Sequence, residues 1–176
     1  MRKKVIIDLG CGANKLENKE PETCVVFGLD IHPFDGVDIV CDLEGTIPLE
    51  SDYADTVLAS HILEHISSPI HIMNEIYRIL RMGGDLHFVV PSTDGMGAFQ
   101  DPTHKSFWNE NSFLYYTKDG YRGLYPDLIK CKFELRQLQV TKSVSEDAFR
   151  GVVVVSGILR KEPLPEGTSR EEEKKT

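Results

Sequence analysis

Short apolar runs that border on aspartates recur through the first part of the chain. Three of them read Val5-Ile6-Ile7-Asp8, Val25-Val26-Phe27-Gly28-Leu29-Asp30 and Ile39-Val40-Cys41-Asp42. Continuous runs of Val, Ile and Leu are typical of strands that are buried on both faces of a parallel sheet. The pattern predicts strands over about 4–10, 24–31, 38–43 and 55–60.

A helical pattern follows these strands. Ser68 and Pro69 are an N-cap residue and a first helical residue by type. Apolar residues then recur at helical spacing, at Ile70, Met73, Ile76, Tyr77 and Leu80. The helix is expected to end at Met82-Gly83-Gly84.

The rest of the chain predicts a strand over 86–91, a long irregular stretch from Ser92 and a short helix that begins near Asn109 or Asn111. Two late strands are expected over about 133–141 and 151–160. Because no crossover helix fits between those two strands, we expect them to pair as an antiparallel hairpin.

These elements predict an α/β fold: a Rossmann-like three-layer α/β/α sandwich whose mostly parallel sheet of about seven strands ends in an antiparallel hairpin. Only some 13 residues separate the first two strands, so the helix between them is expected to be short or degenerate. One domain over 1–161 is expected, with 92–130 as an insertion on the acceptor side. Residues 162–176 are rich in Pro, Gly and charge and are expected to form a disordered tail.

Composition narrows the class of protein. The 176-residue chain contains four cysteines, with no Cys-x-x-Cys pair, no recognisable signal peptide and no apolar stretch of membrane length. We therefore expect a cytoplasmic protein with reduced thiols and no membrane association. The formal net charge of −8 argues against a polyanion as the main partner.

Gly10-Cys11-Gly12 follows the first predicted strand directly. Glycines at this point let the backbone approach a ligand that a Cβ atom would exclude. Asp8, Asp30 and Asp42 end or border three strands of one parallel sheet, so they should gather at one edge. Ligands bind at that edge in open α/β sheets.

The motifs resemble, in order, those of the class I S-adenosylmethionine-dependent methyltransferases. The resemblance covers about residues 1–92 and includes the two terminal strands. It rests on five segments: Asp-Leu-Gly-Cys-Gly at 8–12, Gly-Leu-Asp-Ile at 28–31, Cys-Asp-Leu at 41–43, Ser-His-Ile-Leu-Glu-His-Ile at 60–66 and Arg-Ile-Leu-Arg-Met-Gly-Gly-Asp-Leu at 78–86.

The resemblance implies S-adenosylmethionine as the cofactor and assigns its contacts. Asp30 would accept the ribose hydroxyls, Asp42 the exocyclic amine of adenine, and Leu43 would cover the ring. Ser60 and His61 would face the methyl donor. The implied cofactor-binding residues are Asp8, Gly10, Gly12, Asp30, Ile31, Asp42, Leu43, Ser60 and His61.

The chain departs from that family before its first strand, where three residues stand in place of a helix that closes over the substrate. The lid must therefore come from elsewhere, and 92–130 is the candidate. Its aromatic residues, which include Trp108, Tyr115 and Tyr116, either wall a pocket at the sheet edge or form a satellite core. A second subunit in a homodimer is an alternative cover for the exposed edge.

Residues 101–108 resemble a segment of small, mostly uncharacterised members of the family, which places His104 at the acceptor site. His104 is the expected general base and His61 the second candidate. His61, Glu64, His65 and His104 also resemble a metal-binding set in small-RNA 2′-O-methyltransferases and ubiquinone-pathway O-methyltransferases. Many metal-free members carry Leu-Glu-His too, so we expect a structural Glu–His pair and no bound metal.

The sequence thus predicts a methyltransferase that acts on a hydroxyl of a small molecule or glycan, with nucleic acid as a less favoured acceptor. A nicotinamide-dependent dehydrogenase is one alternative, but Lys15 stands where its third glycine belongs. A cofactor-binding or partner-binding module without turnover is the other alternative.

Overall fold

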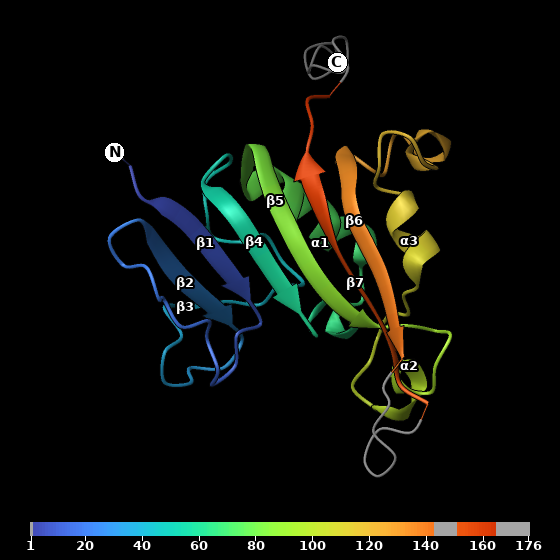
Figure 1. The fold of residues 1–176 in the computed structure, drawn as a ribbon, viewed down its shortest axis with the longest axis horizontal. Coiled ribbons are helices and arrows are strands. Elements are labelled where there is room, and N and C mark those ends of the chain that lie inside the picture. The colour runs from blue at the N-terminus through green and yellow to red at the C-terminus, as the bar shows by residue number, and fades with distance from the viewer. Residues whose placement is uncertain (1, 143–150, 165–176) are drawn as a thin grey trace, which may run out of the picture.

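The computed structural model describes residues 2–142 and 151–164. Seven strands form one sheet in the order β3-β2-β1-β4-β5-β7-β6 (Figure 1). The strands are β1 (Lys4–Leu9), β2 (Cys24–Asp30), β3 (Ile39–Val40), β4 (Ala54–Ser60), β5 (Leu80–Pro91), β6 (Phe133–Lys142) and β7 (Val153–Lys161).

The first five strands run parallel, and β7 pairs antiparallel with both β5 and β6. The mostly parallel sheet and its antiparallel hairpin are therefore confirmed. Between β6 and β7, residues 143–150 lie outside the described part of the chain, as does most of the tail predicted to be disordered, at 165–176.

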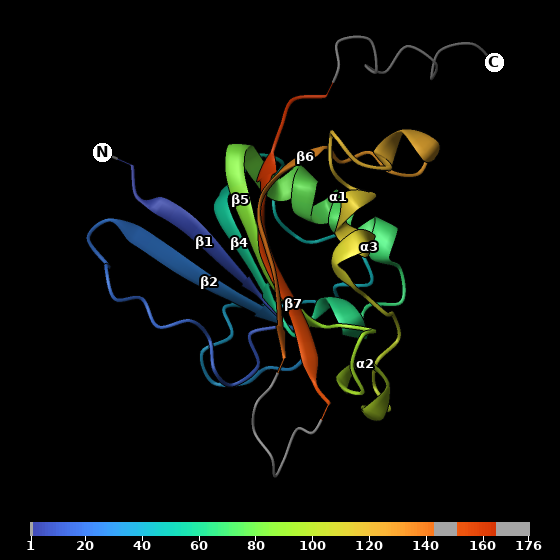
Figure 2. The same ribbon diagram turned by 45° about the vertical axis from the view of Figure 1, so that its right-hand side comes forward.

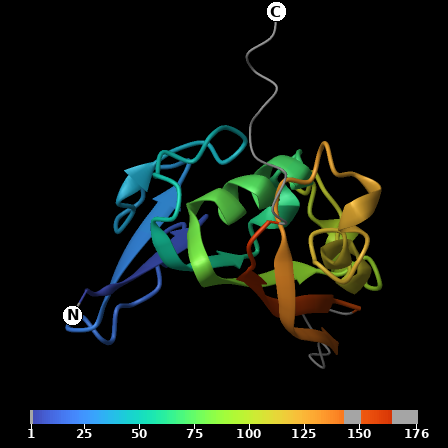
Figure 3. The same cartoon turned by 90° about the horizontal axis from the view of Figure 1, so that it is seen from above.

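Helices cover one face of the sheet. The helical elements of the described residues are η1 (Leu63–His65), α1 (Pro69–Ile79), α2 (Gly97–Gln100), α3 (Glu110–Leu114) and η2 (Arg122–Leu124). Figures 2 and 3 place α1 and α3 on the same side of the sheet. In the described residues no helix lies between β1 and β2, as the short connection indicates, and none lies between β2 and β3. The second helical layer of the expected sandwich is thus not formed there, and the described residues place no helix on the opposite face of the sheet.

Helix α1 packs on the sheet through Ile72, Met73 and Ile76, which are fully buried. Pro69 is its first residue, as predicted, whereas Ser68 occupies the N-cap position without a side-chain cap bond. The helix ends at Ile79, earlier than its apolar pattern indicates. Leu80 is extended and already pairs with Ala54, so the sheet takes up the last residues of the helical pattern.

The predicted aromatic wall is part of the hydrophobic core. Trp108 is 2% exposed and stacks on Phe113, which in turn stacks on Phe88 of β5. Tyr116 packs against Trp108 in the same cluster. Trp108 and Tyr116 therefore belong to the core, which was the alternative to an acceptor lid, whereas Phe99 and Phe107 of the same segment are 57% and 52% exposed. Asn109 caps α3 with a reciprocal capping box, at the predicted place.

Two charged residues of α1 position the segment that follows β3. Glu75 Oε2 accepts the Ile47 amide at 2.8 Å, and Arg78 donates to the carbonyls of Ile47 and Leu49 at 2.8 and 2.7 Å. An ion pair of 2.7 Å joins Glu75 to Arg78. These bonds fix the loop that carries Asp42 and Leu43.

No helix among the described residues is both long and apolar enough to cross a membrane.

Candidate active site

A cleft of about 340 Å³ lies at the edge where β2 and β3 end. Of the residues predicted to bind the cofactor, Gly10, Asp30, Ile31, Asp42 and Leu43 line it. The other lining residues come from 32–44 and from two later segments: His32, Cys41, Glu44, Ile62, His65, Ile66, Thr103 and Lys105. The aspartates at the ends of β2 and β3 are therefore brought together as predicted.

Asp30 joins this cleft to the glycine loop. Its Oδ2 accepts the Gly12 amide at 2.9 Å, and its Oδ1 accepts the His32 amide at 2.9 Å. The residue is 9% exposed. Each carboxylate oxygen has two lone pairs, so both can accept a further hydrogen bond from a ligand hydroxyl.

The glycine loop has left-handed backbone where the sequence places glycines. Gly10 has φ +63° and Gly12 has φ +53°, a region that costs other residues energy. A Cβ atom at Gly10 would lie 2.5 Å from the Ile62 side chain, while one at Gly12 would meet no atom within 4 Å. The space beside Gly12 is therefore open to a ligand.

Asp42 and Leu43 follow β3 in a tight turn. Asp42 Oδ1 accepts the Glu44 amide at 2.9 Å, which holds the turn. Leu43 is 5% exposed, whereas Ile31, which also lines the cleft, is 56% exposed. The cleft thus offers apolar surface together with carboxylate acceptors, which suits a flat heterocycle with a polar edge.

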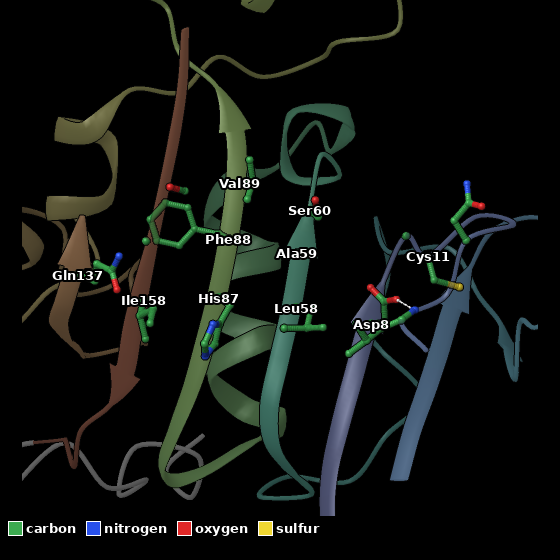
Figure 4. A pocket seen from close by; sticks show the side chains of 15 residues that line it. Asp8, Cys11, Leu58, Ala59, Ser60, His87, Phe88, Val89, Gln137 and Ile158 are labelled. Carbon is green, nitrogen blue, oxygen red and sulfur yellow. Dashed lines mark hydrogen bonds between the residues drawn. The ribbon is translucent and has the colours of Figure 1, made fainter. Parts of the chain in front are cut away.

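A second cleft, of about 610 Å³, lies on the helix-free face of the sheet (Figure 4). Its floor consists of side chains from β4, β5, β6 and β7, and residues of the loop after β1 form one wall. The lining residues are Asp8, Gly10, Cys11, Asn14, Leu16, Leu58, Ala59, Ser60, His87, Phe88, Val89, Gln137, Ser156, Gly157 and Ile158. Gly10 lines both clefts, so the two adjoin at the glycine loop.

Asp8 lies in the second cleft and not beside Asp30. Its Oδ2 accepts the Leu16 amide at 2.8 Å, and burial raises the pKa of its carboxyl group. Asp8 therefore fixes the loop after β1. Of the three aspartates expected at one edge of the sheet, Asp30 and Asp42 line the first cleft and Asp8 lines the second. Gly12 lines neither cleft and acts on the site through its bond to Asp30.

Ser60 is the last residue of β4, and His61 follows it. His61 lines neither cleft. Ser60 lines the second cleft. His61 has φ +52°, a strained conformation of the kind that is concentrated at functional sites. Its Nδ1 lies 3.3 Å from Glu64 Oε1, and its side chain is 53% exposed. The hydrogen bond to Glu64 raises the pKa of His61.

His104 lies behind these residues. Its side chain is 6% exposed, its Nδ1 donates to the Ala98 carbonyl at 2.8 Å, and its ring contacts that of His65 with centroids 5.0 Å apart. His104 lines neither cleft. Its neighbours Thr103 and Lys105 line the first cleft, so the segment reaches the site through them.

Sequence reasoning missed the floor of the second cleft, including His87, Gln137 and Ser156. Each is a polar residue in the middle of an otherwise apolar or alternating strand. The sequence could have indicated them, because successive side chains of a strand face opposite sides of the sheet and these polar residues lie opposite the buried apolar ones. Their convergence also depends on β7 lying between β5 and β6, which the sequence order does not reveal.

Comparison with known proteins identifies a family for the first part of the chain. Residues 1–94 match the model of a family described as hypothetical methyltransferase. No match was found among curated proteins.

Solved structures share the fold. An S-adenosylmethionine-dependent methyltransferase from Methanosarcina mazei is 15% identical, with a TM-score of 0.62 over 92% of this chain and 93% of that one. One from Archaeoglobus fulgidus is 18% identical, with a TM-score of 0.60 over 90% and 86%. A Haloferax volcanii protein, solved in complex with the Trm112 methyltransferase activator, is 18% identical with a TM-score of 0.62 over 88% and 82%.

Proposed function

The chain belongs to the family of hypothetical methyltransferases, and on that basis we propose that it transfers a methyl group from S-adenosylmethionine to a hydroxyl of a neutral small molecule or glycan. When bound, S-adenosylmethionine supplies a methyl group on a positively charged sulfur. The observation that carries the proposal is that two clefts of different chemistry adjoin at Gly10.

The first cleft fits the cofactor. Asp30 would accept the ribose hydroxyls, because both its oxygens retain acceptor capacity and lie at the cleft wall. Asp42 would accept from the adenine amine, with Ile31 and Leu43 against the ring. Gly12, where a Cβ would meet no atom within 4 Å, would leave room for the methionine portion, and the methyl group would be directed toward Ser60.

The second cleft fits a neutral, hydroxylated acceptor. His87, Gln137 and Ser156 offer hydrogen-bonding groups, while Leu58 and Ile158 add apolar surface. Among the described residues that line it, Asp8 is the only acidic one and none is Lys or Arg. A nucleic-acid acceptor would call for basic side chains along its phosphates, so this lining supports a small molecule or glycan.

His61 is the proposed general base. A carboxylate only accepts hydrogen bonds, so the Nδ1–H of His61 donates to Glu64 and its Nε2 is left to take a proton from the acceptor. The half-exposed ring follows Ser60 at the end of β4. Neither histidine lines a cleft. His104, which the sequence favours, is the second candidate because its side chain is 6% exposed, whereas that of His61 is 53% exposed.

Two further features of the sequence reading stay proposals. A cytoplasmic location is supported by the free state of all four cysteines. A homodimer is supported by the helix-free face of the described sheet, which a second subunit would cover. Sedimentation velocity checks the dimer: a single monomeric species at micromolar concentration would exclude it.

The function is tested by S-adenosylhomocysteine formation across a panel of neutral hydroxylated acceptors and short RNA. We expect product with a hydroxylated small molecule or glycan and none with RNA. His61→Ala should lower turnover about 10²–10⁴-fold with little change in cofactor affinity, whereas His71→Ala, on α1, should not. Unchanged turnover in His61→Ala would exclude His61 as the base, and methylation of RNA alone would overturn the acceptor class.

A further inference from the structure

Glu64, His65 and His104 form a cluster of metal-ligating groups. A carboxylate oxygen of Glu64 and one ring nitrogen from each histidine all lie within 4.8 Å of one another. The two halves of the cluster are distant in sequence. They are held together by the backbone amides of Lys105 and Ser106, which donate to the Glu64 carbonyl at 2.8 and 3.0 Å.

Both histidines have one nitrogen occupied and the other available. His104 Nδ1 faces the Ala98 carbonyl at 2.8 Å, and His65 Nδ1 faces the Thr103 carbonyl at 3.3 Å. A carbonyl only accepts, so each Nδ1 carries the hydrogen and each Nε2 keeps a lone pair. His104 Nε2 lies 3.9 Å from Asp101 Oδ2, which is too long for a hydrogen bond. The Thr103 hydroxyl supports this assignment, since it donates to Asp101 at 2.6 Å and accepts from His65 at 3.1 Å.

Glu64 has a buried oxygen that nothing in the described structure satisfies. The residue is 2% exposed. Its Oε1 faces His61, but its Oε2 is buried without a hydrogen-bond partner. A buried carboxylate oxygen without a partner is costly. A cation beside the two free imidazole nitrogens would remove that cost.

We propose that Glu64, His65 and His104 bind a divalent first-row transition metal of the Zn²⁺ or Mn²⁺ type. Two neutral imidazoles and one carboxylate are a ligand set for such ions, whereas Mg²⁺ and Ca²⁺ prefer oxygen ligands throughout. The carbonyls of Ala98 and Thr103 accept from the Nδ1 atoms of His104 and His65 and so orient the two rings, as metal-binding histidines are commonly oriented. This differs from the sequence-based expectation of a structural Glu–His pair without metal.

The site opens toward the chemistry, because His65 also lines the cofactor cleft with Gly10 and Asp30. Three protein ligands leave a coordination position for a further oxygen. If the proposed function holds, the cation would lie beside the cofactor cleft, which His65 lines, and would polarise an oxygen bound there.

The test is metal binding by the full chain with neither cofactor nor acceptor present. Calorimetry with Zn²⁺ and Mn²⁺, and visible absorption with Co²⁺, should show one ion per chain, with Mg²⁺ much weaker. Glu64→Gln and His65→Ala should each weaken binding at least ~10–100-fold, and Thr103→Val about 10-fold. His71→Ala is the matched control, because its ring bonds the Gly45 carbonyl outside the cluster, and it should bind as the wild type does.

Circular dichroism establishes that each variant is folded. Should Glu64→Gln fail to fold, His65→Ala and Thr103→Val carry the test, because they change partly exposed side chains. Absence of binding in the wild type, or binding that persists in His65→Ala, overturns the inference. Methyl transfer without metal binding would refute the metal site and leave the proposed function standing. Metal binding without methyl transfer would support the metal site and count against the proposed function.

Discussion

The Gly12 amide donates to Asp30 Oδ2 at 2.9 Å and thereby ties the glycine loop after β1 to the end of β2. One carboxylate therefore sets both a wall of the cofactor cleft and the position of the loop beside it. This bond explains how a chain whose described residues contain no helix between β1 and β2 still holds an ordered loop there. Asp8 adds a second anchor through Leu16.

The glycine loop can be tested by a matched pair of substitutions. Gly12 and Gly83 both have positive φ, +53° and +75°, and a Cβ at either would meet no atom within 4 Å. Gly12→Ala and Gly83→Ala should each lower the free energy of unfolding by about 1–2 kcal/mol, because both impose left-handed backbone on alanine. Only Gly12→Ala should also weaken cofactor binding, as measured by calorimetry. Equal cofactor affinity in the two variants would refute the role of Gly12 in the site.

Replacement of Trp108 should destabilise the hydrophobic core. Trp108→Ala should lower the free energy of unfolding by about 3–5 kcal/mol in denaturant titrations, since it removes a large buried side chain. Phe99→Ala, at a residue that is 57% exposed, should change it by about 0.5 kcal/mol or less. Similar losses in both variants would contradict the assignment of Trp108 to the core.

Much of the cofactor site could be predicted from the sequence because its residues are local to strand ends. Asp30 and Asp42 follow apolar runs, and parallel strands bring such positions to one edge. The role of Trp108 could not be predicted, because aromatic residues cluster in sequence for a lid and for a core alike. The early end of α1 was also hidden, since Leu80 satisfies the helical pattern and the sheet equally well. His87 and Ser156 meet only because β7 lies between β5 and β6.

Glu44, which lines the first cleft, should make the stability of the protein depend on pH in the acid range. It accepts bonds from the Ser67 amide and hydroxyl and from Lys105, and these lower its pKa to about 2. Because the folded pKa lies below the ordinary value of 4.5, the contribution of Glu44 to stability is fully present above pH 4.5. It should be lost as the pH falls from there through about 2.

Carbon-detected NMR titration of the Glu44 carboxyl group checks this prediction. Lys105→Met removes one of the three donors, so the pKa of Glu44 should rise toward 4.5 in that variant. A wild-type midpoint already near 4.5 would show that these contacts do not hold the carboxylate in solution.

The most direct test of the central claim is calorimetric titration with S-adenosylmethionine and, separately, with NAD. The wild type should bind S-adenosylmethionine and not NAD. Asp30→Ala should weaken binding about 10–100-fold, the loss of a charge-assisted hydrogen bond of about 1.5–3 kcal/mol. Asp35→Ala, which removes an exposed carboxylate from the loop after β2, should bind as the wild type does. Wild-type affinity in a folded Asp30→Ala variant, or tighter binding of NAD than of S-adenosylmethionine, would contradict the account.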